Sequence, residues 1–283
     1  MTHYQIRYEA ENFYQHVVNE ALFEFLVLPT ENNTQLVTAV DVKNSLDLPV
    51  FSSRNVFGYE VLFLRITQPF THLTLAMHCT VRRSTQRVLP DASRCLPLAE
   101  EQRLLQSEDF LVDHYLYVQQ TLLTALPADQ IPPSLVYHRD QSLFEYVQAL
   151  NRAVYEMMEY QPMVTTTTTQ AREVLAHPRG VCQDYSHLML GVLRHHRLPS
   201  RYVTGYLHQG QSFLGSAQLH AWVEVLIPEL GWVGFDPTNN LLADHYHIKV
   251  ADGLDYTDCS PLRGHINPGV INTTGHVVQV VEQ

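Results

Sequence analysis

Residues 180–189 read Gly-Val-Cys-Gln-Asp-Tyr-Ser-His-Leu-Met, and Cys182 opens the helix that this segment predicts. The positive end of a helix dipole and its unpaired N–H groups favour a thiolate, the form of cysteine that attacks carbonyl carbons. A lone cysteine is more often a small buried hydrophobic residue. Here polar Gln183 and Asp184 flank the thiol, and Gly180 allows close substrate approach. We therefore interpret Cys182 as a catalytic nucleophile.

A histidine and an aspartate follow at positions where two neighbouring strands are predicted. Residues 221–227 and 231–235 are rich in Val, Trp and Phe, and the segment between them is typical of a hairpin connection. His220 then opens one strand and Asp236 ends the next, so both lie at the same end of a sheet. The structural alternatives are that His220 is a hydrogen-bonded histidine of the core and that Asp236 with Pro237 only forms a turn.

Together the three residues form a nucleophile, a base and a group that orients the base. His220 would pair with the thiolate, protonate the leaving amine and later activate the acceptor. Asp236 would hold the imidazole in one tautomer and orientation. The backbone N–H of Cys182 is the natural oxyanion donor, and Gln183 and Trp222 are candidates for a second donor or for substrate binding.

Several adjoining motifs occur in one order between Thr165 and Gly264. They are the Thr-rich run 165–169, the segment 201–207, the turn at Asp236, and the stretch from Ile248 to Gly264. This region resembles the catalytic core of the bacterial transglutaminase-like family, which includes predicted cysteine proteases with a papain-type thiol, imidazole and carboxylate. The resemblance implies an N-terminal transglutaminase-associated β domain and a Cys182–His220–Asp236 triad.

The fold class expected is α+β, with an N-terminal β-sandwich followed by a papain-like transglutaminase core. Alternating apolar residues from Leu73 to Val81, Cys79 among them, predict a half-buried strand. Ser142 and Glu145 form a capping-box signature before a helical stripe. The predicted organisation is a sandwich over 1–85, a linker over 86–106, a catalytic domain over 107–265, and a C-terminal extension over 266–283 that forms a strand.

Composition excludes several classes of function. The chain has 283 residues and a net charge of −11, with no dense Lys/Arg run of the kind that binds nucleic acid. No apolar stretch is long enough for a membrane span, and no signal peptide is visible, so a cytoplasmic protein is expected. The four cysteines show no spacing typical of zinc or of disulfides, which fits a reducing compartment.

The sixteen histidines raise the question of a metal. Adjacent helical residues point about 100 degrees apart, so His195 and His196 cannot readily share an ion. His245 and His247 would share a face only in a strand, and no third ligand with obvious spacing accompanies them. We expect no metal and no cofactor.

The sequence predicts a thiol-dependent amide or peptide hydrolase that works through a thioester acyl-enzyme on a peptide or protein substrate. Two alternatives stay open. One is a protein transglutaminase that transfers the acyl group to an amine, and the other is a non-catalytic interaction scaffold. Substrate identity and oligomeric state are not set by the sequence.

Overall fold

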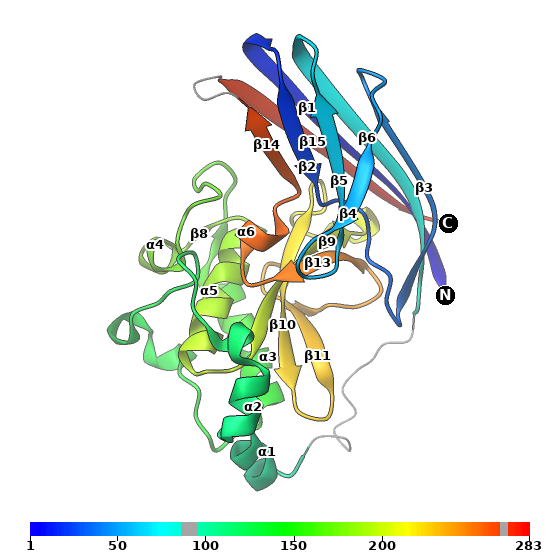
Figure 1. Ribbon diagram of the computed structural model, residues 1–283. Helices are drawn as coiled ribbons and strands as arrows, with labels where there is room; N and C mark the ends of the chain where they lie inside the picture. The colour runs from blue at the N-terminus through cyan, green and yellow to red at the C-terminus, as the bar shows by residue number, and fades with distance from the viewer. Residues whose placement is uncertain (86–95, 267–270) are drawn as a thin grey trace.

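The computed structural model describes residues 1–85, 96–266 and 271–283. A β-sandwich occupies one end of the molecule, and a five-stranded sheet covered by helices occupies the other (Figure 1). This arrangement confirms the α+β class. Part of the predicted linker, including Cys95, lies outside the described residues.

One sheet of the sandwich is built on two long strands that alternate buried and exposed side chains. Its order is β15 (Asn272–Glu282), β1 (Thr2–Val18), β6 (Phe70–Arg83) and β3 (Gln35–Asn44), all antiparallel. The predicted alternation in β6 is confirmed, because Leu73, Leu75, Met77, Cys79 and Val81 are all buried. This period-two burial gives the sheet one apolar face toward the core.

The second sheet supplies the other side of that core. Its order is β14 (Leu262–Ile266), β2 (Ala21–Phe25), β5 (Glu60–Ile66) and β4 (Phe51–Arg54). Phe23 and Phe25 of β2 and Leu64 and Ile66 of β5 are almost fully buried. Apolar residues on the two inner faces therefore close the sandwich.

The predicted boundary at residue 85 left out two strands of the sandwich. β14 pairs with β2 and β15 pairs with β1, so residues 262–266 and 272–282 complete the two sheets. The predicted boundaries assign the first of these strands to the domain over 107–265 and the second to a separate C-terminal extension over 266–283. The physical reason for the return is that β1 and β2 would otherwise leave long unpaired edges. The predicted linker also contains a helix, α1 (Leu98–Leu105).

If β15 is an integral sandwich strand, two adjacent valines should differ sharply in their effect on stability. Val278 is 3% exposed and Val277 is 50% exposed. Val278→Thr buries a hydroxyl and should lower the free energy of unfolding by about 1–3 kcal/mol, whereas Val277→Thr should change it by less than about 0.5 kcal/mol. Urea unfolding of both variants measures this. Equal effects would show that β15 is not packed as described.

The half of the molecule that carries Cys182 is organised around an antiparallel sheet of five strands. Its order is β12 (Leu241–Leu242), β11 (Gly231–Asp236), β10 (His220–Ile227), β9 (Ser200–Leu207) and β13 (His247–Gly253). Helix α5 (Cys182–His195) packs on β9 and β10. Almost every residue of α5 is buried, which identifies it as the central helix of this half.

Several shorter elements complete this half. They are α2 (Glu108–Asp113), α3 (Leu143–Met157), α4 (Ala171–Ala176), α6 (Tyr256–Cys259) and the 3₁₀ turns η2 (Tyr115–Val118), η3 (Ala128–Gln130), η4 (Pro133–Leu135) and η5 (Gln209–Gln211). Three of them, α3, α4 and η2, pack against α5. A short parallel pair, β7 (Glu159–Tyr160) and β8 (Arg179–Gly180), leads into α5. The predicted capping box of Ser142 and Glu145 is present at the start of α3.

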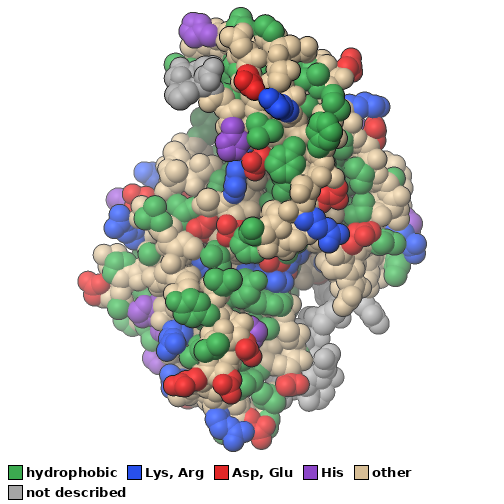
Figure 2. Space-filling view, viewed as in Figure 1, with side chains coloured by type: hydrophobic (Ala, Val, Ile, Leu, Met, Phe, Trp, Pro, Cys, Tyr) green, Lys and Arg blue, Asp and Glu red, His purple; other side chains and the backbone are tan. Residues whose placement is uncertain are grey.

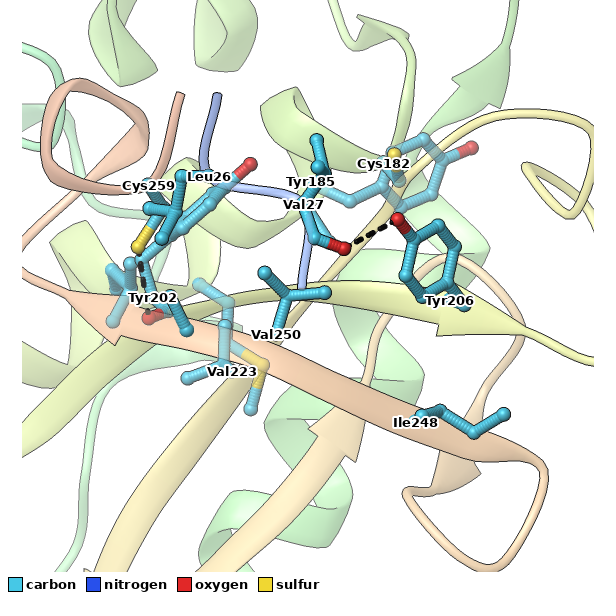
Figure 3. Packing of buried hydrophobic residues seen from close by; sticks show 14 of the residues in the cluster. Leu26, Val27, Cys182, Tyr185, Tyr202, Tyr206, Val223, Ile248, Val250 and Cys259 are labelled. Carbon is cyan, nitrogen blue, oxygen red and sulfur yellow. Dashed lines mark hydrogen bonds between the residues drawn. The ribbon is translucent and has the colours of Figure 1, made fainter. Parts of the chain in front are cut away.

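The two halves meet through buried side chains and backbone groups (Figure 3). Val27, just after β2, lies beside Tyr206 and Val250 of the central sheet, and Leu26 lies beside Cys259. The Tyr206 hydroxyl donates a hydrogen bond of 2.6 Å to the Val27 carbonyl. Its pKa is raised well above the usual range by burial. The sandwich therefore packs against the central sheet beside β10, the strand on which His220 lies.

The molecular surface agrees with the acidic composition. On the face in Figure 2, Lys and Arg side chains are interspersed with Asp and Glu instead of forming a basic patch. Among the described residues, no helix is both long and apolar enough to cross a bilayer.

Candidate active site

Cys182 lies at the first position of α5, as the sequence predicts. The turn before it is held by Asp184, whose Oδ2 accepts hydrogen bonds from the Val181 N–H at 2.8 Å and from the Thr165 hydroxyl at 2.7 Å. A Cβ atom at Gly180 would collide with the same carboxylate. Glycine and aspartate thus fix the backbone on which the thiol sits. Asp184 has a structural role here.

His220 and Asp236 meet at one end of the central sheet. β10 and β11 pair antiparallel with Val223 opposite Phe235, so the start of β10 and the end of β11 coincide. His220 Nε2 lies 2.8 Å from Asp236 Oδ2, and both side chains are fully buried. The predicted convergence of these two residues is present in the structure.

The charge on Asp236 controls the ionisation of His220. Burial alone would lower the pKa of the imidazole, but the charge and hydrogen bond of Asp236, with a further contribution from Cys182, raise it to about 10. Burial would raise the pKa of Asp236, but the charge and hydrogen bond of His220 and the hydrogen bond of His247 hold it well below its usual range. At neutral pH the pair is therefore imidazolium and carboxylate.

The second ring nitrogen of His220 is left for the thiol. Nδ1 is buried and has no hydrogen bond of ordinary geometry to any described group. The Cys182 sulfur is nevertheless close enough to raise the pKa of the ring. Catalytic hydrogen bonds are often long or poorly aligned until substrate binds. The structure thus brings Cys182, His220 and Asp236 together.

Other groups besides His220 donate hydrogen bonds to Asp236. Oδ2 also accepts hydrogen bonds from His247 Nε2 at 3.2 Å and from Asn239 Nδ2 at 2.8 Å. Oδ1 accepts hydrogen bonds from the backbone N–H groups of Thr238 at 3.0 Å and Asn239 at 3.3 Å. A buried carboxylate with several donors stays ionised and fixed in orientation.

The loop between β9 and β10 covers the imidazole. Asn239 makes two hydrogen bonds to the backbone of Leu214. Its Oδ1 accepts from the Leu214 N–H at 2.8 Å, and its Nδ2 donates to the Leu214 carbonyl at 3.2 Å. Gly215 has a φ of +81°, and a Cβ there would lie 2.7 Å from His220 Nδ1. With His220 fully buried and Cys182 only 9% exposed, substrate must displace part of this cover.

The two candidates for a second oxyanion donor are engaged elsewhere. Gln183 is buried and its amide donates to the Thr167 carbonyl at 3.3 Å. Trp222 is buried against His247, with ring centroids 5.3 Å apart, and against His220 at 6.4 Å. Both contacts are structural. An oxyanion or substrate-binding role for Gln183 or Trp222 stays a prediction.

Four contributors to this site were not found from the sequence. His247 was considered only as a metal ligand beside His245, and Asn239 and Gly215 were not singled out. Tyr160 was also missed. Burial and the nearby charge of Cys182 raise its pKa to about 12. The polar residues directly after Asp236 could have indicated that Asn239 belongs to the site. Gly215 and Tyr160 are brought to the site only by tertiary folding, so the sequence gives no local signal for them.

His220, Asp236 and His247 also have the spacing of a potential metal site. One ligand atom from each lies within 4.8 Å of the other two. However, the Asp244 backbone N–H donates to His247 Nδ1 at 3.2 Å. Nδ1 is therefore unprotonated, and Nε2 carries the proton in the neutral ring, whereas a metal would need the lone pair of Nε2. The donor set fits a hydrogen-bond network better than a metal centre.

A separate cavity of about 590 Å³ lies between the sandwich and the central sheet, and Cys182 is not among the residues that line it. It is bounded by sandwich residues 30–34 and 57–59 and by four charged residues of the central sheet, Arg201, Glu224, Lys249 and Asp252. These charges neutralise one another, with Arg201–Glu224 at 2.6 Å and Lys249–Glu224 at 2.7 Å. The network joins β9, β10 and β13 and contributes to the framework, not to the triad.

Known proteins resemble this chain over different lengths. Residues 134–237 match the family described as the transglutaminase-like superfamily. An uncharacterized protein of Mycobacterium leprae is 29% identical over 257 residues, covering 89% of this chain and 88% of the relative. A protein-glutamine gamma-glutamyltransferase of Pseudomonas aeruginosa is 35% identical over 121 residues, covering 38% of this chain and 18% of the relative.

Among solved structures, one described as a "putative cysteine protease" from Cytophaga hutchinsonii is similar over 99% of this chain and 90% of its own. The TM-score is 0.70 at 19% identity, which shows a shared fold. The matched family region contains Cys182, His220 and Asp236. Residues 134–237 therefore form a transglutaminase-like domain, and this match supports a thiol-dependent enzyme at the level of the superfamily.

Proposed function

We propose that this protein is a thiol-dependent hydrolase of amide or peptide bonds that acts through a thioester on Cys182. The observation that carries the proposal is the buried His220, which is held by Asp236 through one ring nitrogen and leaves the other beside the Cys182 sulfur. An imidazolium in this position favours the thiolate and supplies the proton that the leaving amine needs.

The reaction follows from these positions. The Cys182 sulfur attacks the carbonyl carbon, and the C=O electron pair moves to oxygen. When the tetrahedral intermediate collapses, the C–N bond breaks and His220 Nδ1 gives its proton to the amine. Water then attacks the thioester, its proton passes to His220, and the C–S bond breaks to release the acid and the sulfur. Asp236 keeps its charge throughout and stabilises the imidazolium.

Hydrolysis is proposed over amine transfer because water needs no binding site. An amine acceptor needs a channel for its stem and a means of excluding water. The similarity to the P. aeruginosa glutamyltransferase supports transfer as the second candidate. A peptide or protein is the proposed substrate. The three described cysteines are all free, which supports a proposed cytoplasmic location.

The test combines substrate profiling with acceptor competition. Purified protein is incubated with peptide and glutamine-donor libraries, and the acyl-enzyme on Cys182 is trapped and identified by mass spectrometry. The trapped species is then exposed to graded primary amine. We expect free acid to exceed amide at millimolar amine. If amide dominates, the protein is a transferase, and if no acyl-enzyme forms with any substrate, the scaffold alternative is supported.

A further inference from the structure

Asp236 is shared between two histidines, and the second of them has a fixed tautomer. His247 opens β13 and is 1% exposed. Its Nδ1 accepts the Asp244 backbone N–H at 3.2 Å, and its Nε2 faces Asp236 Oδ2 at 3.2 Å. A backbone N–H can only donate, so the ring must present its own proton to Asp236. His247 is thus a neutral donor in this geometry.

We infer that His247 is a positioning residue that sets how strongly Asp236 acts on His220. It shares Oδ2 with the His220 Nε2 contact at 2.8 Å. A donor to one carboxylate oxygen satisfies part of its charge and fixes the rotation of the carboxylate plane. His247 therefore holds Oδ2 toward His220 and moderates the attraction between them. This inference deepens the proposed function and rests on it.

The surroundings of His247 favour this role. The charged or titratable groups facing it are Asp236, Asp244 and His220, the last with ring centroids 6.2 Å away. Asp244 Oδ1 lies 3.6 Å from Nδ1, and His247 helps to hold the pKa of that carboxyl below its usual range. The Asp244 backbone N–H is closer to Nδ1, at 3.2 Å, and we therefore assign the tautomer from this contact. Trp222 packs edge-on against the ring and restricts its rotation.

The direction of the effect follows from electrostatics. If the His247 donor is removed, the charge of Asp236 acts more fully on His220, and the imidazolium is stabilised further. We expect His247→Leu to raise the titration midpoint of His220 by roughly 0.5 unit or more. His247→Gln, which can place an N–H near the position of Nε2, should keep the midpoint close to that of the parent protein.

The experiment is ¹⁵N NMR of the imidazole rings in full-length protein carrying Cys182→Ala, which removes the sulfur charge. His247 is assigned from the signal lost in His247→Gln, and Asp244→Asn serves as the control because its backbone N–H is unchanged. We expect a neutral, Nε2-protonated His247 in the parent and in Asp244→Asn, and a raised His220 midpoint only in His247→Leu.

Three results would overturn the inference. They are an Nδ1-protonated or charged His247 at neutral pH, an unchanged His220 midpoint in His247→Leu, and equal shifts in the Leu and Gln variants. If His247→Leu does not fold, the tautomer in the parent decides. None of these readouts requires turnover, so absence of hydrolysis would count against the proposed function and leave this inference to its own test.

Discussion

Cys182→Ala is expected to lower turnover by on the order of 10⁴-fold or more, because it removes the atom that forms the acyl-enzyme. The change takes away one sulfur from a site that is 9% exposed, so the fold should be retained. Steady-state kinetics on a hydrolysed substrate measures the loss, and circular dichroism checks the fold. Retained activity in a folded Cys182→Ala protein would remove the thiol mechanism.

Chemical labelling tests the same residue without a substrate. Iodoacetamide at mildly acidic pH should alkylate Cys182 faster than Cys79 or Cys259, because burial suppresses the thiolate form of the other two cysteines. Burial raises the pKa of Cys79 to about 12 and that of Cys259 well above its usual range. Cys259→Ala is the matched control and should leave the labelling rate of Cys182 unchanged. Mass mapping that finds Cys182 inert would contradict the assignment.

Local sequence patterns predicted several elements in both halves of the molecule. The capping residues of α3, the turn before α5 and the alternation in β6 are written in contiguous residues, and the structure contains all of them. The hairpin after β10 likewise placed His220 and Asp236 at one end of the sheet. Each of these features depends on neighbours along the chain, for which periodicity and turn chemistry are sufficient.

Features that depend on distant residues were not predictable in this way. The return of β14 and β15 to the sandwich is set by the edges that β1 and β2 leave unpaired, and the pattern of β15 itself contains no information on its partner. His247 was considered only as a metal ligand beside His245, and its contact with Asp236 requires the start of β13 to lie at the same end of the sheet as the end of β11. Spacing alone left its role undefined.

Asp236→Asn is the second change with a large expected effect, and we expect kcat/KM to fall by on the order of 10²–10⁴-fold. Asp236 opposes the burial that would otherwise lower the pKa of His220, so the neutral amide should let that pKa fall below its ordinary value of 6.5. The imidazolium is then lost at neutral pH. The alkaline limb of the pH–rate profile should therefore move to lower pH.

The same substitution should also destabilise the fold. Five N–H groups donate hydrogen bonds to the two carboxylate oxygens of Asp236. In the Asn variant the side-chain NH₂ would replace one oxygen, so at least one of these N–H groups would face another donor. Leaving a buried donor unpaired costs about 1–3 kcal/mol. Because the folded pKa of His220 is raised, its contribution to stability is complete below about pH 6.5 and is lost as the pH rises toward about 10.

Asp244→Asn provides the matched control, since Asp244 touches the other side of the His247 ring but makes no described contact with His220. It should keep both the activity and the alkaline limb near those of the parent protein. Urea unfolding at pH 7 and pH 9 should show the stability difference between parent and Asp236→Asn shrinking at the higher pH. If Asp236→Asn retains parental activity and an unshifted pH profile, Asp236 serves only the turn at the end of β11, and the imidazolium at His220 must be maintained by another group.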